Sequence, residues 1–419
     1  MDILKKHRSA IYSIISLFLR LLVGPLSILL ITTKLSLDEQ GIYYTFISIA
    51  AIQWVFELGV STALVQTLSG ISKKKHFQSY VKLGAVFFMT TAFFLFFAML
   101  IYSLWVFSSL NTSQWLYPWL LYSLFICLNI FNNICLIIEE GKVNPEKVYF
   151  VKLLSGVAYA VFLLLSLFMG AGLYALAFGQ IGLFLVVFSL LNTNYKHIYI
   201  SFISIPFITV KACGKKLFKF QYKLSLVWIA GYFYWNFYSI YFFKFVGSNY
   251  AGQYGATNAV IGAIAIAMIS FLQTKRSNMT RLICEKKIDQ TIDILKDSVL
   301  LGCCGFIVIT TIFYVALNWY GGELETRFLN NYILMSVIVL RFIILCHEFI
   351  LIYLRTYQDE PLYKITIVNY LLTPIVIVVC YHFNMGDNLF YFASFVQLLF
   401  LFPCLYLAKK YVTNKANIL

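Results

Sequence analysis

Residues 331–354 read NYILMSVIVLRFIILCHEFILIYL, a long apolar run that contains Arg341 and Glu348. The run is long enough to cross a bilayer, whose hydrocarbon core needs about 20 apolar residues of helix. A charge at bilayer depth costs at least ~2.5 kcal/mol on insertion scales, so it usually faces a protein interior or a water-filled cavity. The stretch therefore predicts a membrane-spanning helix whose two charges carry a function.

The whole chain has the composition of this stretch. Its 419 residues are 61% hydrophobic and 12% charged, with a mean hydropathy of +0.83. A soluble domain is closer to roughly a quarter charged. The basic start before Arg8 leads into an apolar run without a small-residue cleavage site, so we expect a retained span and no signal peptide. The composition predicts an all-α integral membrane protein.

Twelve apolar stretches are predicted to span the membrane, with boundaries uncertain by several residues. They are residues 10–33, 42–68, 78–108, 115–138, 148–169, 172–192, 219–245, 251–273, 294–317, 331–354, 363–382 and 388–408.

The segments between successive spans alternate between many and few lysine and arginine residues. Apart from Arg20 and Arg341 inside the spans, almost all of them lie toward the side that holds the N-terminus, and only Lys34, Lys244 and Arg327 lie toward the other. Because an excess of Lys and Arg marks the cytoplasmic side, we expect both termini in the cytoplasm. The net charge of +15 is thus explained by topology, and no nucleic-acid partner is expected. The nine cysteines form no CxxC pair, so neither a disulfide framework nor a metal site is predicted.

The spans divide into two predicted lobes of six helices. The expected boundaries are 1–193 for the N-terminal lobe, 194–218 for a basic cytoplasmic loop, and 219–419 for the C-terminal lobe. A short match supports a repeat, because residues 37–43 (LDEQGIY) and 248–254 (SNYAGQY) follow the first span of each lobe. Asp38 and Asn249 are the expected helix N-caps. The alternative is two similar outer turns without a repeat.

Arg20 lies near the middle of the first predicted span. Ser16 and Gly24 are four residues away on either side, so the three share one small, polar helical face. A guanidinium on such a face can bind phosphate oxygens with two parallel hydrogen bonds. The alternative is a structural arginine held by a carboxylate or by carbonyl groups.

Glu57 lies centrally in the second predicted span, on one face with Gln53 and Ser61. A carboxylate there can take up a proton or a cation and so change its charge state. It can equally pair with Arg20 on the adjacent antiparallel helix. Both interpretations remain open.

Arg341 and Glu348 are seven residues apart, so they lie on one helical face, and Arg355 continues that face toward the cytoplasm. His347 points elsewhere on the helix. Such a stripe suits the wall of an aqueous path. The alternative is an internal brace between the arginine and the glutamate.

Two polar groups are candidates for sugar contacts. Asn129 and Asn133 lie in the fourth span, where interhelical hydrogen bonding is the commoner role of an amide. Tyr234 and Asn236 belong to an aromatic run in the seventh span, where packing is the alternative to stacking on a sugar.

No enzyme constellation is present in the sequence, because GxxxxGK[ST], HExxH and GxSxG motifs are all missing. We expect neither catalytic activity nor a cofactor.

Residues 34–44 (KLSLDEQGIYY) and the later Phe56-Glu57-Leu58-Gly59 resemble the beginning of the O-antigen and polysaccharide repeat-unit flippases. These are transporters of the multidrug/oligosaccharidyl-lipid/polysaccharide exporter superfamily. The resemblance implies a V-shaped bundle of two six-helix lobes with a cationic cavity, in the bacterial inner membrane. It also implies alternating-access transport of an undecaprenyl-diphosphate-linked oligosaccharide to the periplasmic leaflet.

The resemblance implies roles for the intramembrane charges as well. Arg20 and Arg341 would neutralise the diphosphate, and Glu57 and Glu348 would couple transport to H+ or Na+ or balance charge. Membrane lipids and the polysaccharide polymerase machinery are the further partners implied.

Two alternatives remain. A cation-coupled multidrug exporter of the same superfamily should contain acids in its pocket, but here mid-membrane arginines match the glutamates in number. A membrane polysaccharide polymerase or ligase needs a sizeable outer loop, and no predicted outer loop is long enough.

Overall fold

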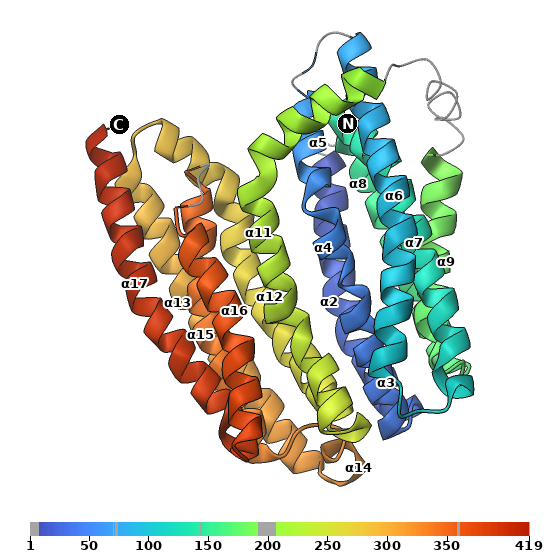
Figure 1. Cartoon of the computed structure of the whole chain (residues 1–419). Helices are drawn as coiled ribbons and strands as arrows, with labels where there is room; N and C mark the ends of the chain where they lie inside the picture. Colours follow the sequence, from blue (N-terminus) through green and yellow to red (C-terminus); the bar gives the residue numbers. More distant parts are fainter. Residues whose placement is uncertain are drawn as a thin grey trace. The chain divides into compact units, whose positions relative to one another are not determined.

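The structure is a computed structural model of the chain and describes residues 8–69, 71, 74–142, 145–191, 207–357 and 361–418. Within these ranges every regular element is a helix (Figure 1). The N-terminal helices are α2 (Arg8–Lys34), α3 (Leu37–Ala50), α4 (Gln53–Glu57), α5 (Val60–Ser69), α6 (Lys74–Val106), α7 (Thr112–Gly141), α8 (Pro145–Phe168) and α9 (Tyr174–Leu191). They are followed by α11 (Phe207–Phe245), α12 (Ser248–Cys284), α13 (Ile288–Tyr320), α14 (Gly322–Glu325), α15 (Asn331–Arg355), α16 (Tyr363–His382), the 3-10 helix η2 (Gly386–Asn388) and α17 (Leu389–Ile418).

A long helix, or the broken segment α3–α5, lies on each of the twelve predicted spans. Among the described residues, nine helices are long and apolar enough to cross a membrane, and the broken segment brings the number to ten. The first and seventh predicted spans coincide with α2 and α11, which have 27 and 39 residues. The prediction of an all-helical, multi-pass membrane protein is therefore confirmed.

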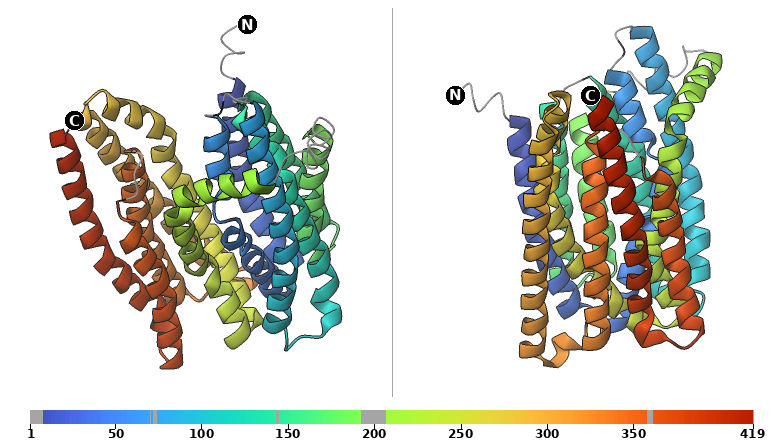
Figure 2. Two further views of the ribbon diagram at one scale, coloured as in Figure 1. Left: turned by 45° about the horizontal axis from the view of Figure 1, so that its top comes forward. Right: turned by 90° about the vertical axis from the view of Figure 1, so that its left-hand side faces the viewer.

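The chain forms two compact units. Unit 1 comprises Met1–Tyr232 and Ser239–Ala251, and unit 2 comprises Phe233–Tyr238 and Gly252–Leu419. Helices α2–α9 thus belong to unit 1, α13–α17 belong to unit 2, and α11 and α12 contribute residues to both (Figure 2). Of the predicted basic loop at 194–218, the part up to residue 206 lies outside the described residues, and the rest is the beginning of α11.

Large aromatic side chains fill the core of unit 1. The ring of Phe46 on α3 packs against Trp119 on α7, with ring centroids 4.8 Å apart. Phe107, just after α6, contacts both Phe46 and Trp115. Edge-on and tilted contacts of this kind are favourable for aromatic rings, and all four side chains are almost completely buried. They join α3, α6 and α7 into one bundle.

Helix α3 begins with a capping box. The Ser36 hydroxyl accepts a hydrogen bond from the Glu39 backbone amide, and the Glu39 carboxylate accepts one from the Ser36 amide. The prediction of Asp38 as the cap was therefore wrong by two residues. The Asp38 side chain instead accepts a hydrogen bond from the Ser248 hydroxyl, so the starts of the two proposed repeat motifs meet within unit 1.

Gly41 allows the beginnings of α3 and α12 to approach each other closely. A Cβ at Gly41 would collide with the backbone carbonyl group of Ser248. Since backbone atoms cannot rotate away as a flexible side chain can, only glycine fits at this crossing without moving a helix.

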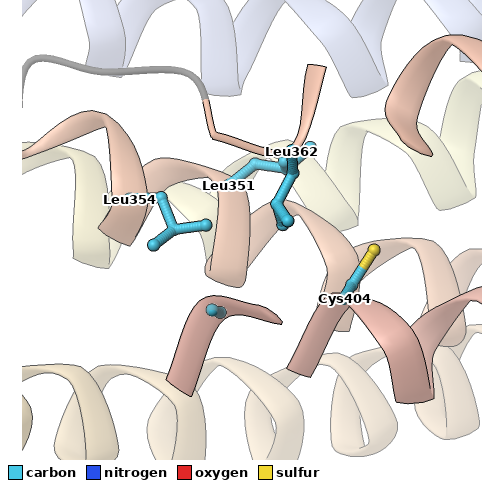
Figure 3. Packing of buried hydrophobic residues seen from close by; sticks show 5 residues of the cluster. Leu351, Leu354, Leu362 and Cys404 are labelled. Carbon is cyan, nitrogen blue, oxygen red and sulfur yellow. The ribbon is translucent and has the colours of Figure 1, made fainter. Parts of the chain in front are cut away.

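In unit 2, a buried cluster holds α15 against α17 at the end where both helices carry basic residues. Leu351 and Leu354 of α15 pack with Leu362 and with Cys404 and Ala408 of α17 (Figure 3). Deeper in the same unit, the buried Gln397 donates hydrogen bonds to Asn369 and Thr373 on α16. The network extends to α15, because Nε2 of His347 forms a 2.9 Å hydrogen bond with the backbone carbonyl of Gln397. These contacts join α15 and α16 to α17. His347 and Glu348 nevertheless line the same small cavity, so the expectation that His347 points elsewhere on the helix is not confirmed.

Replacing Gly41 by alanine is expected to lower the free energy of unfolding by about 1–3 kcal/mol, because the added methyl group must displace a helix backbone. Thermal unfolding of the purified protein in detergent measures the loss. Gly156→Ala is the matched control, since a Cβ at Gly156 meets no heavy atom within 4 Å. Equal melting temperatures for the two variants would show that the crossing of α3 and α12 is not tight.

Candidate functional site

Arg341 is held in unit 2 by two partners from different helices. Its Nη2 donates a hydrogen bond of 2.7 Å to Oδ1 of Asn258 on α12. Its guanidinium carbon lies 4.8 Å from the centroid of the Trp235 ring on α11. Cation–π contact and a charge-assisted hydrogen bond both offset part of the cost of keeping this charge inside the membrane. Neither partner is a carboxylate, so the positive charge of Arg341 is not neutralised by them.

A small cavity adjoins this guanidinium. Arg341, Asn258, Trp235, Tyr238 and Tyr254 are among the residues that line it, and its volume is about 20 Å³. The Tyr238 hydroxyl is buried and has no hydrogen-bond partner among the described residues. A water molecule needs about 10–15 Å³, so the cavity holds one water-sized group. A whole diphosphate group would fit only after the aromatic side chains move.

Glu348 lies two turns from Arg341, beside a second cavity of about 10 Å³. The Tyr370 hydroxyl is 3.5 Å from Oε1 of Glu348, a weak hydrogen bond at the limit of normal geometry. The Tyr370 ring stacks on Tyr234 with centroids 4.4 Å apart. Tyr234 and Ile344 line both cavities, so they lie between the arginine cavity and the glutamate cavity.

In unit 1, Glu57 lies at a break in the helix of the second predicted span. Leu58 and Gly59 have φ of 53° and 69°, and the segments on either side are bent by 43°. A left-handed leucine is uncommon, and such strained positions concentrate at functional sites. The hydroxyl of Ser225 on α11 donates a 3.1 Å hydrogen bond to the Leu58 carbonyl, which secures the break.

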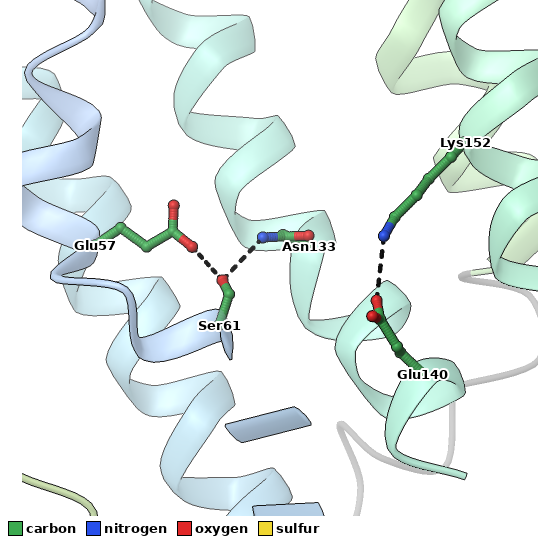
Figure 4. A network of polar contacts seen from close by, with 5 residues as sticks. All are labelled: Glu57, Ser61, Asn133, Glu140 and Lys152. Atoms are coloured by element: carbon green, nitrogen blue, oxygen red, sulfur yellow. Dashed lines mark hydrogen bonds and ion pairs between the residues drawn. The ribbon is translucent and has the colours of Figure 1, made fainter. Parts of the chain in front are cut away.

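A short polar chain fixes the Glu57 side chain (Figure 4). Ser61 donates a hydrogen bond to the carboxylate, and Asn133 on α7 donates one of 3.2 Å to the Ser61 hydroxyl. The same figure shows the ion pair between Glu140 and Lys152, 3.1 Å long, which joins the ends of α7 and α8. The sequence analysis did not predict the break, because it treated residues 42–68 as one continuous span.

The other site residues predicted from the sequence differ in the contacts that they make. Asn129 donates hydrogen bonds to the backbone and side-chain oxygens of Gln180 on α9, so it joins two helices. Tyr234 is buried in its stack, and the Asn236 amide nitrogen is buried without a partner among the described residues. Arg20 belongs to α2, but its side chain lies outside the described residues. The roles of these side chains toward a substrate stay predictions.

The structure adds Asn258, Trp235 and Tyr238 to the predicted set around Arg341. Trp235 and Tyr238 belong to the aromatic run of the seventh span, but nothing in the sequence singled them out. The one sequence feature that points to Asn258 is weak: it is an amide within an apolar span. Across the described residues, no group of three His, Cys, Asp or Glu side chains is arranged to hold a metal ion.

Asn258→Ala is expected to cost about 1–2 kcal/mol of folding free energy, because it leaves a desolvated guanidinium donor without its acceptor. Tyr238→Phe removes a hydroxyl that has no protein partner, so it should change stability by less than about 0.5 kcal/mol. Denaturant titration in detergent compares the two variants. A loss in Tyr238→Phe as large as that in Asn258→Ala would contradict this geometry.

Comparison with protein-family models found no match, and comparison with curated proteins found none either. Comparison with solved structures did find matches, and three of them illustrate the likeness. An inward-facing multidrug resistance MATE family transporter of the MOP superfamily has a TM-score of 0.70 at 12% identity, over 95% of this chain and 96% of that one. The lipid II flippase MurJ, in an inward closed conformation, has a TM-score of 0.67 at 14% identity, over 97% and 90%.

The third structure is a MOP superfamily transporter from Pyrococcus furiosus, with a TM-score of 0.57 at 11% identity, over 97% of this chain and 95% of that one. Identities this low do not carry substrates or mechanisms from one chain to another. The likeness covers nearly the whole chain in each case, so the chain has the helical fold of MOP superfamily transporters.

Proposed function

We propose that this protein is a flippase that moves a polyprenyl-diphosphate-linked oligosaccharide, an O-antigen or capsule repeat unit, across the inner membrane. The substrate would pass from the cytoplasmic to the periplasmic leaflet. The observation that carries the proposal is Arg341, a mid-span cation whose described partners, Asn258 and Trp235, are both neutral. Such a cation attracts an anionic ligand to the middle of the membrane.

The fold supports transport of this kind. MOP superfamily transporters share it, and one protein that shares it is described as a lipid II flippase. Alternating access of two helical units around a mid-membrane site is the general mode of such repeat-built carriers.

The roles that we propose for the site residues follow from their charges. Arg341, together with Arg20, would bind the diphosphate, while the two aromatic cavity walls at Trp235 and Tyr238 would move aside for it. Glu348 and Glu57 would take up H+ or Na+, or balance the arginines when no substrate is bound. Asn129, Asn133, Tyr234 and Asn236 remain proposed contacts for the sugars.

The proposed setting is the bacterial inner membrane, with both termini in the cytoplasm and with lipids and polymerase machinery as partners. A multidrug exporter is the second candidate, and the half-buried carboxylates of Glu57 and Glu348 favour it. An exporter of cationic drugs would, however, have to tolerate the unneutralised Arg341 in its own cavity.

Deletion of the gene should leave lipid-linked repeat units on the cytoplasmic leaflet and remove the surface polysaccharide. Repeat units that reach the periplasm but stay unpolymerised would instead identify a polymerase. Drug sensitivity with a normal surface polysaccharide would identify an exporter.

Arg341→Ala should reduce surface polysaccharide by at least about tenfold, since one charge-assisted hydrogen bond to phosphate contributes about 1.5–3 kcal/mol. Immunoblots of surface polysaccharide, with membrane levels of the protein as the reference, measure this loss. Lys296→Ala removes an equal charge from an exposed position and should have no effect. Normal polysaccharide in Arg341→Ala would remove this residue from the site.

A further inference from the structure

The break beside Glu57 brings two tryptophans to the same place in unit 1. Trp54 precedes Glu57 by one helical turn, so the two side chains are neighbours on α4. Trp228 on α11 meets Trp54 edge-on, with ring centroids 6.3 Å apart and planes at 72°. Ser225, one turn before Trp228, is the residue that holds the Leu58 carbonyl. The contact between α11 and the break therefore sets the position of both rings.

Both indole rings stay accessible. Trp54 is 37% exposed and Trp228 is 38% exposed, so part of each ring is open to a ligand. Lipid contact is the simplest explanation for an exposed tryptophan in a membrane protein. It conflicts with Glu57, because a half-buried carboxylate on the same helical face at mid-span would then also face lipid. The cost of a charge in lipid therefore favours a water-facing surface at Trp54, Glu57 and Trp228 over a lipid-facing one.

The Glu57 carboxylate retains hydrogen-bonding capacity. In the part of the chain that the structure describes, Ser61 alone donates to it, and Figure 4 shows the second carboxylate oxygen pointing away from Ser61. An ionised carboxylate is an acceptor only, with about four lone-pair sites. Asn133 is a positioning residue here, since it fixes Ser61 and Ser61 fixes the carboxylate.

Rigid aromatic faces next to a held carboxylate suit a sugar ring. The C–H face of a pyranose packs on the electron-rich face of an indole, and its hydroxyl groups donate to a carboxylate. We propose that Trp54, Trp228 and Glu57 form a carbohydrate subsite, which binds one sugar ring of the transported oligosaccharide. The subsite rests on the proposed function for its ligand, and it lies in unit 1, whereas Arg341 lies in unit 2.

A hydrophobic cation is the main competitor for this surface, because aromatic faces and a carboxylate also bind cations. The sugar is favoured by the proposed function, and the acceptor sites that Ser61 leaves open on the carboxylate can receive its hydroxyl groups. Glu57 can bind a hydroxyl group while ionised and still take up a proton at another stage of transport.

The subsite is tested with the diphosphate-free oligosaccharide cleaved from the surface polysaccharide of the host. Calorimetric titration of the purified full-length protein should show saturable binding that weakens about tenfold in Trp54→Ala, Trp228→Ala and Glu57→Gln. Trp54→Phe should restore most of the affinity, because it keeps an aromatic face. Trp319→Ala removes an exposed tryptophan from the C-terminal end of α13, and this variant should bind as the wild type does.

The outcomes separate the subsite from the proposed function. Arg341→Ala should keep its affinity for the diphosphate-free oligosaccharide while losing transport. Unchanged affinity in the tryptophan and Glu57→Gln variants would overturn the subsite and leave the flippase proposal standing. Binding of tetraphenylphosphonium in place of the oligosaccharide, lost in the same variants, would also overturn it and favour an exporter. A normal surface polysaccharide in the deletion strain would instead contradict the flippase proposal.

Discussion

The cost of holding a charge inside a membrane is the constraint on which this structure depends. Arg341 meets that cost with an amide acceptor on α12 and an indole ring on α11, and with no carboxylate among these contacts. The arrangement desolvates the guanidinium without neutralising it. These contacts join α15 to α11 and α12, and we propose that the guanidinium, which they leave positively charged, also attracts an anion. The buried Gln397 then matters because it joins α17 to Asn369 and Thr373 on α16, and its backbone carbonyl contacts His347 on α15, the helix that carries Arg341.

The two acids are held differently from each other. Glu348 has a weak contact with Tyr370 across a cavity the size of one water molecule. Glu57 is fixed by Ser61 and Asn133 at a helix break that is itself secured by Ser225. We propose that the firmly positioned Glu57 recognises a ligand, in addition to the role in coupling or charge balance that the sequence predicts for both glutamates.

Much of the fold was predictable from the sequence because hydropathy and the length of an apolar run have a direct physical link to membrane crossing. Each predicted span coincides with helix for that reason. Helix caps and breaks depend on individual side chains, and the hydropathy pattern does not predict them. Ser36 and Glu39 carry the capping-box signature, which the prediction of Asp38 overlooked. The left-handed turn at Leu58 had no signal, because leucine rarely adopts that conformation.

The candidate site was predictable only in part. The four intramembrane charges stand out by their cost, so the sequence alone predicts Arg341, Glu57 and Glu348 as site residues, and their roles stay predictions. Their partners were not predicted, because Asn258 and Arg341 are 83 residues apart and meet only through the packing and rotation of α12 and α15. The pairing of Trp54 with Trp228 likewise depends on where α11 crosses the break. Contacts between distant helices leave no local pattern in a single sequence.

The central claim is that Arg341 provides a site for an anion, and direct binding of undecaprenyl diphosphate to the purified protein tests it. Native mass spectrometry of detergent-solubilised wild type and Arg341→Ala, with Lys296→Ala as the charge-matched control, gives the bound fractions. The account predicts that the lipid binds the wild type and the control equally and binds Arg341→Ala at least about tenfold more weakly. Equal binding by all three proteins would contradict it.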